Sequence, residues 1–321
     1  MGAALALAER GIGRTAPNPS VGCVIVADGK VVGRGWTQTG GRPHAEADAL
    51  RQAGASALGA TAYVTLEPCA HASTRGPDCS GSLVASGLAR VVVALVDPDP
   101  RTAGQGIERL RAAGIAVDVG PGEAAARVQL AGFLSRLSRG RPFTTLKLAL
   151  SLDGCIALAS GESRWITGPV ARAHAHLERA RTDLIVVGRG TLEADDPALD
   201  VRLEGLEDRT PRAAVLSRTL DRIPADKRLA GALLLRDIAK VDAMPDVLTV
   251  LVEGGASLAA SLLAADRIDR LLVHRAPIVL GGKPGVARLD LPDLTSAHGR
   301  WSQSRTQALG VDRLEVYERN G

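Results

Sequence analysis

The sequence predicts an α/β protein made of two consecutive domains, and three observations lead to that prediction. The chain has 321 residues, of which 45 % are hydrophobic, so it is long enough to bury two cores. Short apolar strands alternate with helical stretches along its length, which is typical of helices packed on a sheet. A polar stretch rich in breakers, residues 138–142, separates two such series. We therefore expect one domain over residues 1–140 and a second over residues 143–321.

The first domain is expected to open with a helix and a hairpin. Residues 3–8 are helical in pattern, and the strands at 21–27 and 31–36 flank Asp28-Gly29, the strongest short signal for a hairpin. The elements that follow are helices from His44, from Cys79, at 107–113 and at 123–138, with strands at 60–66, 90–96 and 115–119. This order predicts a mixed sheet between layers of helices.

The second domain is expected to contain another sheet. Its strands are predicted at 144–151, 183–187, 248–252, 270–277 and 313–318, with helices at 169–181 and 256–265. The strand that ends at Val187 runs into Gly188-Arg-Gly190. This Gly-x-Gly lacks the third glycine and the spaced acidic residue of a Rossmann fingerprint, so we reject that fold.

One histidine and two cysteines in the first domain have the pattern of a catalytic metal site. His44 begins a helix, Cys69 follows a strand, and Cys79 begins the next helix. Such a set supplies three zinc ligands and leaves a fourth position for water. Glu46 lies two residues from His44, where a carboxylate that does not bind the metal can move protons, as in zinc deaminases. The alternative is two structural cysteines and an unrelated histidine.

A glycine turn in the second domain predicts a phosphate site. A strand ending at Val252 is followed by Glu253-Gly-Gly-Ala-Ser257 and a helix rich in Ala and Leu. The free N–H groups and the dipole of such a helix start suit a pyrophosphate. The alternative is that Gly254 and Gly255 only permit tight packing of the helix on its strand.

Composition excludes several other classes of function. The net charge is +4, the basic residues are scattered, and only 2 % of residues are aromatic, so we expect no nucleic-acid partner. No apolar run is long enough to span a bilayer, and the first ten residues do not form a signal peptide. Four cysteines in a chain of this length are no disulfide framework, which favours the reducing cytoplasm.

Taken together, the motifs resemble those of the bifunctional riboflavin-biosynthesis deaminase–reductase family over nearly the whole chain. In the first domain these are Thr15-Ala-Pro-Asn-Pro-Ser-Val-Gly-Cys, His44-Ala-Glu, Gly59-Ala-Thr-Ala-Tyr-Val-Thr-Leu-Glu-Pro-Cys and Asp97-Pro-Asp-Pro. In the second they are Lys147-Leu-Ala-Leu-Ser-Leu-Asp-Gly, Gly161-Glu-Ser-Arg-Trp-Ile-Thr, Arg179-Ala-Arg-Thr-Asp, Asp195-Asp-Pro-Ala-Leu and Glu253-Gly-Gly-Ala. The resemblance implies a cytidine-deaminase-like α/β/α sandwich followed by a dihydrofolate-reductase-like α/β domain.

The resemblance also implies an activity and a substrate. A zinc-dependent deaminase would act on 2,5-diamino-6-ribosylamino-4(3H)-pyrimidinone 5′-phosphate, and an NADPH-dependent reductase would then convert the ribosyl side chain to ribityl. We also expect a homo-oligomer. The alternative within the family is a deaminase whose second domain is a degenerate nucleotide-binding module.

For the deaminase, the resemblance assigns the metal ligands to His44, Cys69 and Cys79 and the proton shuttle to Glu46. Asn18 and His71 match positions that contact the pyrimidine. The loop between the cysteines is one residue longer than is usual in the family, and Arg75 stands for its basic residue.

For the reductase, the resemblance assigns two sets of contacts. The substrate-binding positions are Lys147, Ser163, Arg179, Leu199, Arg202 and Glu253. Among them, Arg179 and Arg202 would hold the 5′-phosphate. The NADPH-binding positions are Ala149, Trp165, Thr191, Asp195, Ser217, Gly255, Ala256 and Ser257, and Asp195 is also a candidate catalytic residue. Residues 230–247 leave little room for the strand and helix expected there, and we assign no function to His174 or His176.

Two rival classes remain open from the sequence. A zinc-stabilised binding module would sense a nucleotide without turnover, but such a module has no use for Glu46 beside its metal. A nucleic-acid base deaminase would need a basic, aromatic surface.

Overall fold

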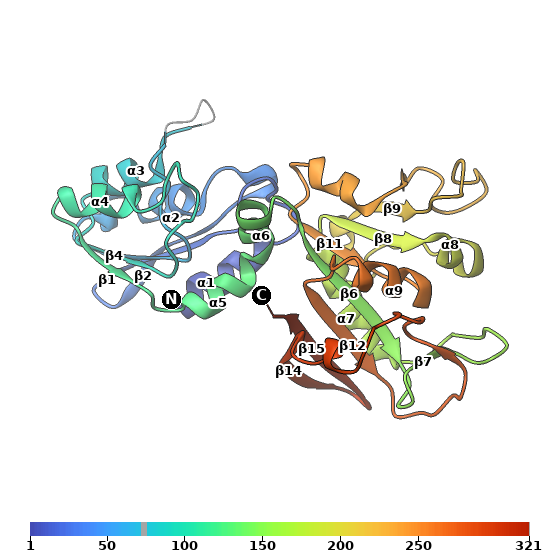
Figure 1. Cartoon of the computed structure of the whole chain (residues 1–321). Coiled ribbons are helices and arrows are strands. Elements are labelled where there is room, and N and C mark those ends of the chain that lie inside the picture. The colour runs from blue at the N-terminus through green and yellow to red at the C-terminus, as the bar shows by residue number, and fades with distance from the viewer. Residues whose placement is uncertain (72–75, 321) are drawn as a thin grey trace. The chain divides into compact units, whose positions relative to one another are not determined.

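The structure is a computed structural model that describes residues 1–71 and 76–320, and it divides into two compact units (Figure 1). The first unit is Met1–Arg141 and the second is Pro142–Gly321.

The first unit is built on a five-stranded sheet in the order β2-β1-β3-β4-β5. The first pairs, β2–β1 and β1–β3, are antiparallel, and β3–β4 and β4–β5 are parallel. The strands are β1 (Gly22–Ala27), β2 (Lys30–Trp36), β3 (Thr61–Val64), β4 (Arg90–Val93) and β5 (Ala116–Val119). Asp28 and Gly29, which connect β1 to β2, both have positive φ angles, of 49° and 72°, as a tight hairpin turn requires.

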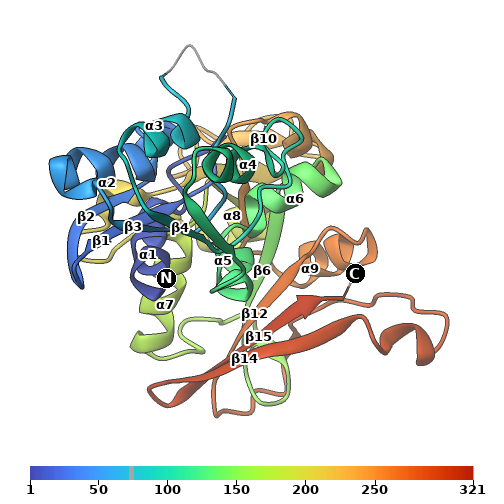
Figure 2. The same ribbon diagram turned by 90° about the vertical axis from the view of Figure 1, so that its left-hand side faces the viewer.

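Helices cover both faces of this sheet (Figures 1 and 2). A Cβ atom added to Gly33 or Gly35 of β2 would strike the backbone of α2, and one added to Gly22 of β1 would strike α1. The two helices therefore pack closely on opposite faces. The helices are α1 (Gly2–Ala8), α2 (Ala45–Ala53), α3 (Cys79–Ala85), α4 (Gln105–Ala112), α5 (Glu123–Gln129) and α6 (Ala131–Arg139).

The single helix predicted from residue 123 to 138 is wrong. The chain forms α5 and α6, separated at Leu130, whose backbone leaves the helical region (φ −91°, ψ 8°). The Leu130 side chain is 2 % exposed and belongs to the core of the first unit. Burial of Leu130 at a bend in the chain replaces the uninterrupted helix that the sequence pattern favoured.

The second unit is built on an eight-stranded sheet in the order β10-β9-β8-β11-β6-β12-β15-β14. The strands from β10 to β12 in this order are parallel, and β15 and β14 extend the sheet in antiparallel fashion. Their bounds are β6 (Phe143–Leu150), β8 (Leu184–Gly188), β9 (Arg212–Leu216), β10 (Leu233–Leu235), β11 (Thr249–Val252), β12 (Arg270–Arg275), β14 (Trp301–Leu309) and β15 (Asp312–Arg319). A separate pair joins β7 (Cys155–Ala157) to β13 (Lys283–Pro284).

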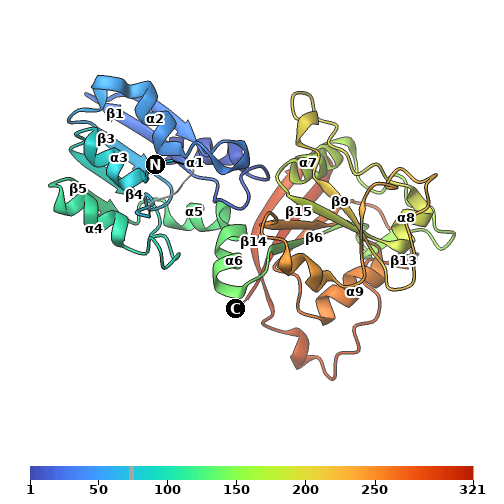
Figure 3. The same cartoon turned by 90° about the horizontal axis from the view of Figure 1, so that it is seen from above.

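The helices α7 (Pro169–Ala180) and α9 (Ala256–Ala264) pack on opposite faces of this sheet (Figure 3). Leu146, Leu148 and Val250 pack with α9, and Leu272 and Leu314 pack with Ala171 of α7. The third helix, α8 (Arg189–Asp195), places Leu192 against Ile185 and Val215. Together, the two units form the mixed α/β fold class that the sequence predicts.

Three strands of the sheet, β9, β10 and β14, lie outside the five strands predicted from the sequence pattern. The edge strand β14 is exposed along most of its length, so it lacks the apolar alternation that marks a half-buried strand (Figure 2). The strand β10 lies in the segment 230–247, where it pairs with β9, and a 3₁₀ helix (Ile238–Ala243) follows it. That segment therefore holds the expected strand, with only a short 3₁₀ helix after it.

Within the part of the chain that the structure describes, no helix is both long and apolar enough to cross a membrane.

Candidate active sites

Two helix starts and the end of a strand bring the predicted metal ligands together in the first unit. His44 is the N-cap residue of α2, and Cys79 is the first residue of α3. Cys69 follows β3, and its carbonyl accepts a hydrogen bond from Ser80 N, so it is tied to the start of α3. Asp78 caps α3 by accepting from Gly81 N at 2.6 Å, which holds the first turn that carries Cys79.

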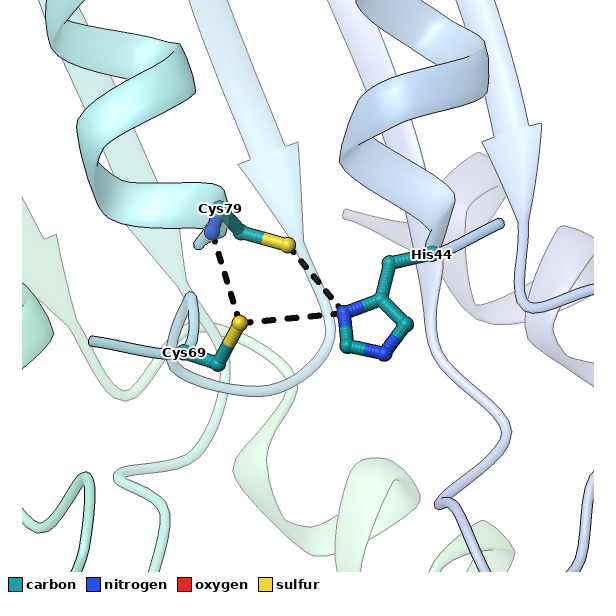
Figure 4. Close-up of side chains that lie close together, drawn as sticks. All are labelled: His44, Cys69 and Cys79. Atoms are coloured by element: carbon teal, nitrogen blue, oxygen red, sulfur yellow. Dashed lines mark hydrogen bonds between the residues drawn. The ribbon is translucent and has the colours of Figure 1, made fainter. Parts of the chain in front are cut away.

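The three side chains converge on one point (Figure 4). Their ligand atoms all lie within 4.8 Å of one another. His44 Nδ1 is 3.2 Å from Cys79 Sγ and 3.7 Å from Cys69 Sγ, and the Cys79 main-chain N–H donates to Cys69 Sγ at 3.3 Å. Cys69 and Cys79 therefore meet in the structure, although nine residues separate them in the sequence.

The chemistry of this donor set fits zinc. Two thiols and one imidazole nitrogen are soft and borderline ligands of the kind that zinc prefers, and three protein ligands are the number found in catalytic sites. The pKa of the Cys69 thiol is lowered, first by a hydrogen bond from Cys79, whereas the pKa of Cys79 is raised by that same interaction and by burial. Thiols bind zinc as thiolates, so metal binding at these two cysteines would release their protons.

Glu46 lies in the first turn of α2, buried beside the cluster. Its residue is 4 % exposed, and its carboxyl interacts with the thiol of Cys79. Burial raises the pKa of Glu46, and the nearby His44 opposes that shift. A carboxyl whose pKa is moved toward neutrality is suited to take up and release a proton near pH 7.

Of the two predicted pyrimidine-contacting residues, Asn18 contacts the cluster, and His71 lies two positions after Cys69 in the sequence. Asn18 Nδ2 lies 3.2 Å from His44 Nε2 and donates to Gly41 O at 2.8 Å. Gly41 has a φ of 85°, and an added Cβ would lie 2.7 Å from Asn18 Cγ, so glycine is required for this approach. His71 Nδ1 is 3.3 Å from the hydroxyl of Thr102. Arg75 lies outside the described residues.

Sequence reasoning missed Glu67, a buried residue two positions before Cys69. Its carboxylate accepts hydrogen bonds from the main-chain N–H groups of Asp97, Gly104, Gly106 and Ile107. Glu67 therefore joins the Cys69 strand to the 97–104 loop and to the start of α4. An acidic residue between Leu66 and Pro68 in an otherwise apolar stretch was the available signal, because a buried carboxylate needs partners.

In the second unit, most of the predicted residues lie where parallel strands end. Carboxyl ends of parallel strands share one edge of a sheet, which is where open α/β sheets bind ligands. Ala149 is near the end of β6, Thr191 is in the helix after β8, Ser217 follows β9, and Glu253 follows β11. Lys147 and Ala149 are half-buried alternate residues of β6 and therefore face the same side.

The predicted substrate residues Arg179 and Glu253 bind each other. Arg179 donates from Nε and Nη2 to the two carboxylate oxygens of Glu253, at 2.7 and 2.9 Å, and from Nη1 to Asp200 O at 2.9 Å. Burial favours a raised pKa for Glu253, but the hydrogen bonds and charge of Arg179 hold its pKa at about 2. In this structure the charge of Arg179 is thus paired with Glu253, and three of its five N–H donors are engaged.

The predicted residues of the 163–202 region differ in exposure. Leu199 is 3 % exposed and packs in the core, so its main chain is what can face a ligand, whereas Arg202 is exposed. Trp165 is 66 % exposed, with the Arg172 guanidinium 4.7 Å from its ring centre. Asp195 ends α8, where its carbonyl accepts from Arg164 at 2.7 Å. Ser163 lies half-buried in the loop before α7.

The two glycines of the turn differ in their surroundings. Gly254 fits the packing interpretation, and Gly255 fits the phosphate-site interpretation. A Cβ on Gly254 would lie 2.6 Å from Leu258 Cδ2, so Gly254 is needed for packing. A Cβ on Gly255 would meet nothing within 4 Å, and no side chain caps α9 at this residue. The first N–H groups of α9, at Ala256 and Ser257, therefore point from an open turn.

Ser217, which is predicted to bind the cofactor, organises the turn after β9. Its hydroxyl accepts from Thr219 N and Leu220 N, at 3.3 and 3.0 Å. Arg189, at the start of α8, donates to the Thr219 hydroxyl at 3.1 Å. A basic residue thus lies beside the Ser217 turn, at the edge of the sheet that carries the glycine turn.

Two family models match the chain. Residues 1–95 match the cytidine and deoxycytidylate deaminase zinc-binding region, and residues 142–313 match the RibD C-terminal domain. Each match falls within one of the two units of the structure.

Curated relatives are similar over most of their length. The riboflavin biosynthesis protein RibD of Escherichia coli is 41 % identical, over 88 % of this chain and 88 % of that protein. The protein of the same name from Mycobacterium tuberculosis is 39 % identical, over 98 % and 95 %.

Solved structures of whole proteins agree in fold. Acinetobacter baumannii RibD superposes with a TM-score of 0.88 at 36 % identity, covering 99 % of this chain and 97 % of that one. A diaminohydroxyphosphoribosylaminopyrimidine deaminase/5-amino-6-(5-phosphoribosylamino)uracil reductase from Thermotoga maritima gives 0.88 at 29 % identity, covering 100 % and 97 %. These matches confirm the predicted family, the fold class, the two activities and the zinc cofactor. The chain belongs to the RibD family of bifunctional riboflavin-biosynthesis enzymes.

Proposed function

We propose that residues 1–140 carry the deaminase of this bifunctional enzyme and residues 143–321 its NADPH-dependent reductase, with the residues assigned above in the two sites. The substrate is 2,5-diamino-6-ribosylamino-4(3H)-pyrimidinone 5′-phosphate. It loses an exocyclic amine as ammonia, and its ribosyl side chain is then reduced to ribityl. The convergence of His44, Cys69 and Cys79 beside the buried Glu46 is the observation that supports the deaminase most strongly.

In the deaminase, His44, Cys69 and Cys79 would hold the zinc ion. When bound, zinc supplies the Lewis acidity that lets water attack the ring carbon at neutral pH. Glu46 takes the proton that this water loses and delivers it to the departing ammonia. The raised pKa of Glu46 suits both halves of that transfer. Asn18 and His71 orient the pyrimidine.

In the reductase, the chain binds and aligns two molecules. NADPH supplies the hydride, so the protein must hold the opened ribose against the nicotinamide. We assign the pyrophosphate of NADPH to the open N–H groups after Gly255, and the 2′-phosphate to the region of Arg189 and Ser217. Lys147, Ser163, Arg202 and the main chain of Leu199 would hold the substrate, with Arg179 and Glu253 beneath it. Asp195 remains our candidate for a catalytic group.

We also propose that the enzyme works in the cytoplasm as a homo-oligomer. The support for the location is the cysteine usage and a substrate that is a phosphorylated metabolite. The exposed edge strand β14 offers unpaired main-chain groups to a second copy.

The test is to follow ammonia and NADPH separately. The purified enzyme is mixed with the diaminopyrimidinone ribotide, with and without NADPH. We expect ammonia release in both mixtures, and oxidation of one NADPH for each deaminated molecule in the second. A chelator should stop ammonia release but leave reduction of the already deaminated ribotide intact. Ammonia release without any NADPH oxidation would restore the deaminase-only alternative.

A further inference from the structure

His176 has a position that the assignments above do not use. It lies on α7, one turn before Arg179, and faces the loop that carries Arg202. His176 Nδ1 is 3.1 Å from Asp200 O, and Nε2 is 3.4 Å from Arg202 Nη2. The imidazole therefore bridges helix α7 to the main chain at Asp200 and to the Arg202 guanidinium.

The neighbours of His176 decide which nitrogen carries its proton. Nδ1 lies between an acceptor, Asp200 O at 3.1 Å, and a donor, the Arg202 main-chain N–H at 3.3 Å, so the contact at Nε2 decides which nitrogen carries the proton. The Arg202 guanidinium can only donate, so Nε2 must present a lone pair. In this structure His176 is thus a neutral imidazole with its proton on Nδ1. Its Nε2 lies against Arg202, the more exposed of the two arginines predicted to hold the phosphate.

The loop that presents Arg202 is held in place by an unusual backbone. Leu199 has a φ of 55°, although it is not glycine, and its side chain is buried at 3 % exposure. Such a conformation persists only where the surrounding packing enforces it, and it clusters at ligand sites. The turn delivers Asp200 and Arg202 to the side of α7 that carries His176 and Arg179.

Charge around the site leaves room for an anion. Arg179 is paired with Glu253. Arg202 is 3.4 Å from His176 Nε2 and 3.6 Å from Asp200 Oδ1, an oxygen without a hydrogen-bond partner among the described residues. Arg202 is 57 % exposed, so a phosphate can reach it. If a phosphate oxygen replaces the Arg202 guanidinium next to Nε2, the imidazole of His176 can donate a hydrogen bond to it after taking up a second proton.

Resting on the proposed function, we propose that His176 is a third member of the 5′-phosphate subsite of the reductase, which holds Arg202 in the free enzyme and donates Nε2–H to a phosphate oxygen in the complex. When the phosphate dianion binds, Nε2 takes up one proton from solvent. Sequence reasoning left His176 without a function because a histidine on a helix rich in Ala, Arg and Glu is more often a surface residue.

The surrounding groups give the direction of this proton uptake. The charged groups that face His176 are Arg179 on α7, Asp200 and Arg202 in the loop, and Glu253 after β11. Burial lowers the pKa of His176 first, and the charges of Arg179 and Arg202 lower it further. A phosphate dianion opposes both cations, so binding favours the protonated ring and should weaken as pH rises.

The experiment compares two substrates in the reductase reaction alone. The already deaminated ribotide and its dephosphorylated riboside are assayed with NADPH on wild type and on His176→Ala. A lost charge-assisted hydrogen bond is worth roughly ten- to a hundredfold, so KM for the ribotide should rise by about that factor. KM for the riboside and the kcat of both substrates should stay within a few-fold of wild type.

His176→Gln and His174→Gln make the comparison specific. His176→Gln keeps a neutral donor and should recover part of the ribotide affinity. His174 lies on the same helix but pairs with His274, at 3.1 Å, so its replacement reports what loosening α7 does by itself. His174→Gln should change both substrates equally.

Calorimetry without NADPH tests binding apart from turnover. The deaminated ribotide is titrated in two buffers of different ionisation heat, and we expect proton uptake by wild type at pH 7.5 that is lost in His176→Gln. Equal effects of His176→Ala on ribotide and riboside, or unchanged proton uptake in His176→Gln, would overturn the inference. A wild type that binds the ribotide with proton uptake but never oxidises NADPH would refute the proposed reductase and leave the phosphate subsite standing.

Discussion

The predicted sites of the two units differ in how complete they are before any ligand binds. In the first unit, His44, Cys69 and Cys79 already converge from three separate elements. In the second unit, Arg179 and Glu253 bind each other, and the remaining predicted residues are spread over the ends of several strands and the loops before α7 and after α8. A small metal ion needs ligands within a few ångströms of one point, so helix starts must hold them rigidly. A dinucleotide and a ribotide need a long stretch of the sheet edge to bind. Charged side chains along that edge pair with one another while no substrate is bound.

The largest effect should come from Glu46→Gln, which tests whether Glu46 acts together with the His44, Cys69 and Cys79 cluster in deamination. Glutamine keeps the size of the side chain but cannot carry the proton, so deamination should fall by about 10²- to 10⁴-fold. Zinc content, measured by atomic absorption, should match that of wild type. Reduction of the deaminated ribotide should be unaffected, because the two sites lie on different units. A deamination rate within a few-fold of wild type would remove Glu46 from the mechanism.

The next largest effect should come from Arg179→Met. It tests whether the ion pair between Arg179 and Glu253 stabilises the second unit when no substrate is bound. The substitution leaves the Glu253 carboxylate, 12 % exposed, without its partner. Breaking a buried ion pair in this way costs about 3–5 kcal/mol of folding free energy. Urea unfolding monitored by hydrogen exchange should show the loss in the second unit alone.

The double variant Arg179→Met/Glu253→Gln is the matched control. It removes the stranded charge and should regain most of the lost stability, while ribotide binding stays impaired. If Arg179→Met unfolds at the urea concentration of wild type, the two residues are held by the rest of the fold and not by each other.

A smaller effect is expected on the pH dependence of stability. It should appear only in the second unit, because it comes from His274. This residue is 1 % exposed, and burial, with the charge of Lys147, lowers its pKa to about 3. The unfolded chain takes up the proton near pH 6.5, so the stability is complete above that pH and is lost as pH falls toward 3. Each unit of pKa shift corresponds to about 1.4 kcal/mol.

His274→Leu should therefore flatten the acid dependence of the second unit between pH 6.5 and 3 and leave the first unit unchanged. Thermal unfolding of both proteins across this range measures the difference. Identical pH profiles would mean that His274 does not carry the acid sensitivity.

The smallest effect concerns the glycine turn. Gly255→Asp places a carboxylate where we assign the NADPH pyrophosphate and should weaken NADPH binding by about tenfold, the equivalent of about 1.4 kcal/mol. Gly255→Ala should be harmless, because a Cβ there meets nothing, whereas Gly254→Ala should destabilise the unit through its contact with Leu258. Nicotinamide fluorescence and thermal unfolding give the two readouts. Full NADPH affinity in Gly255→Asp would show that the cofactor does not use this turn.

Prediction from sequence was most complete where chemistry restricts residue types. The cluster of His44, Cys69 and Cys79 could be predicted because few patterns combine a histidine, two cysteines and a neighbouring carboxylate such as Glu46. The hairpin at Asp28-Gly29 was equally readable, since its turn needs positive φ angles. The strand β14 was missed because its exposed side chains carry no apolar alternation.

The sequence by itself determined the two-domain α/β order and the identity of the residues that meet at the metal cluster, because periodicity and ligand chemistry are local properties. Tertiary structure alone decided the bend at Leu130, the anchoring of α4 by Glu67, the pairing of Arg179 with Glu253, and the position of His176 against Arg202. Each of these joins residues through burial or through a hydrogen bond between distant segments. The free energy of such a contact depends on what surrounds it, and that information is absent from any short stretch of the chain.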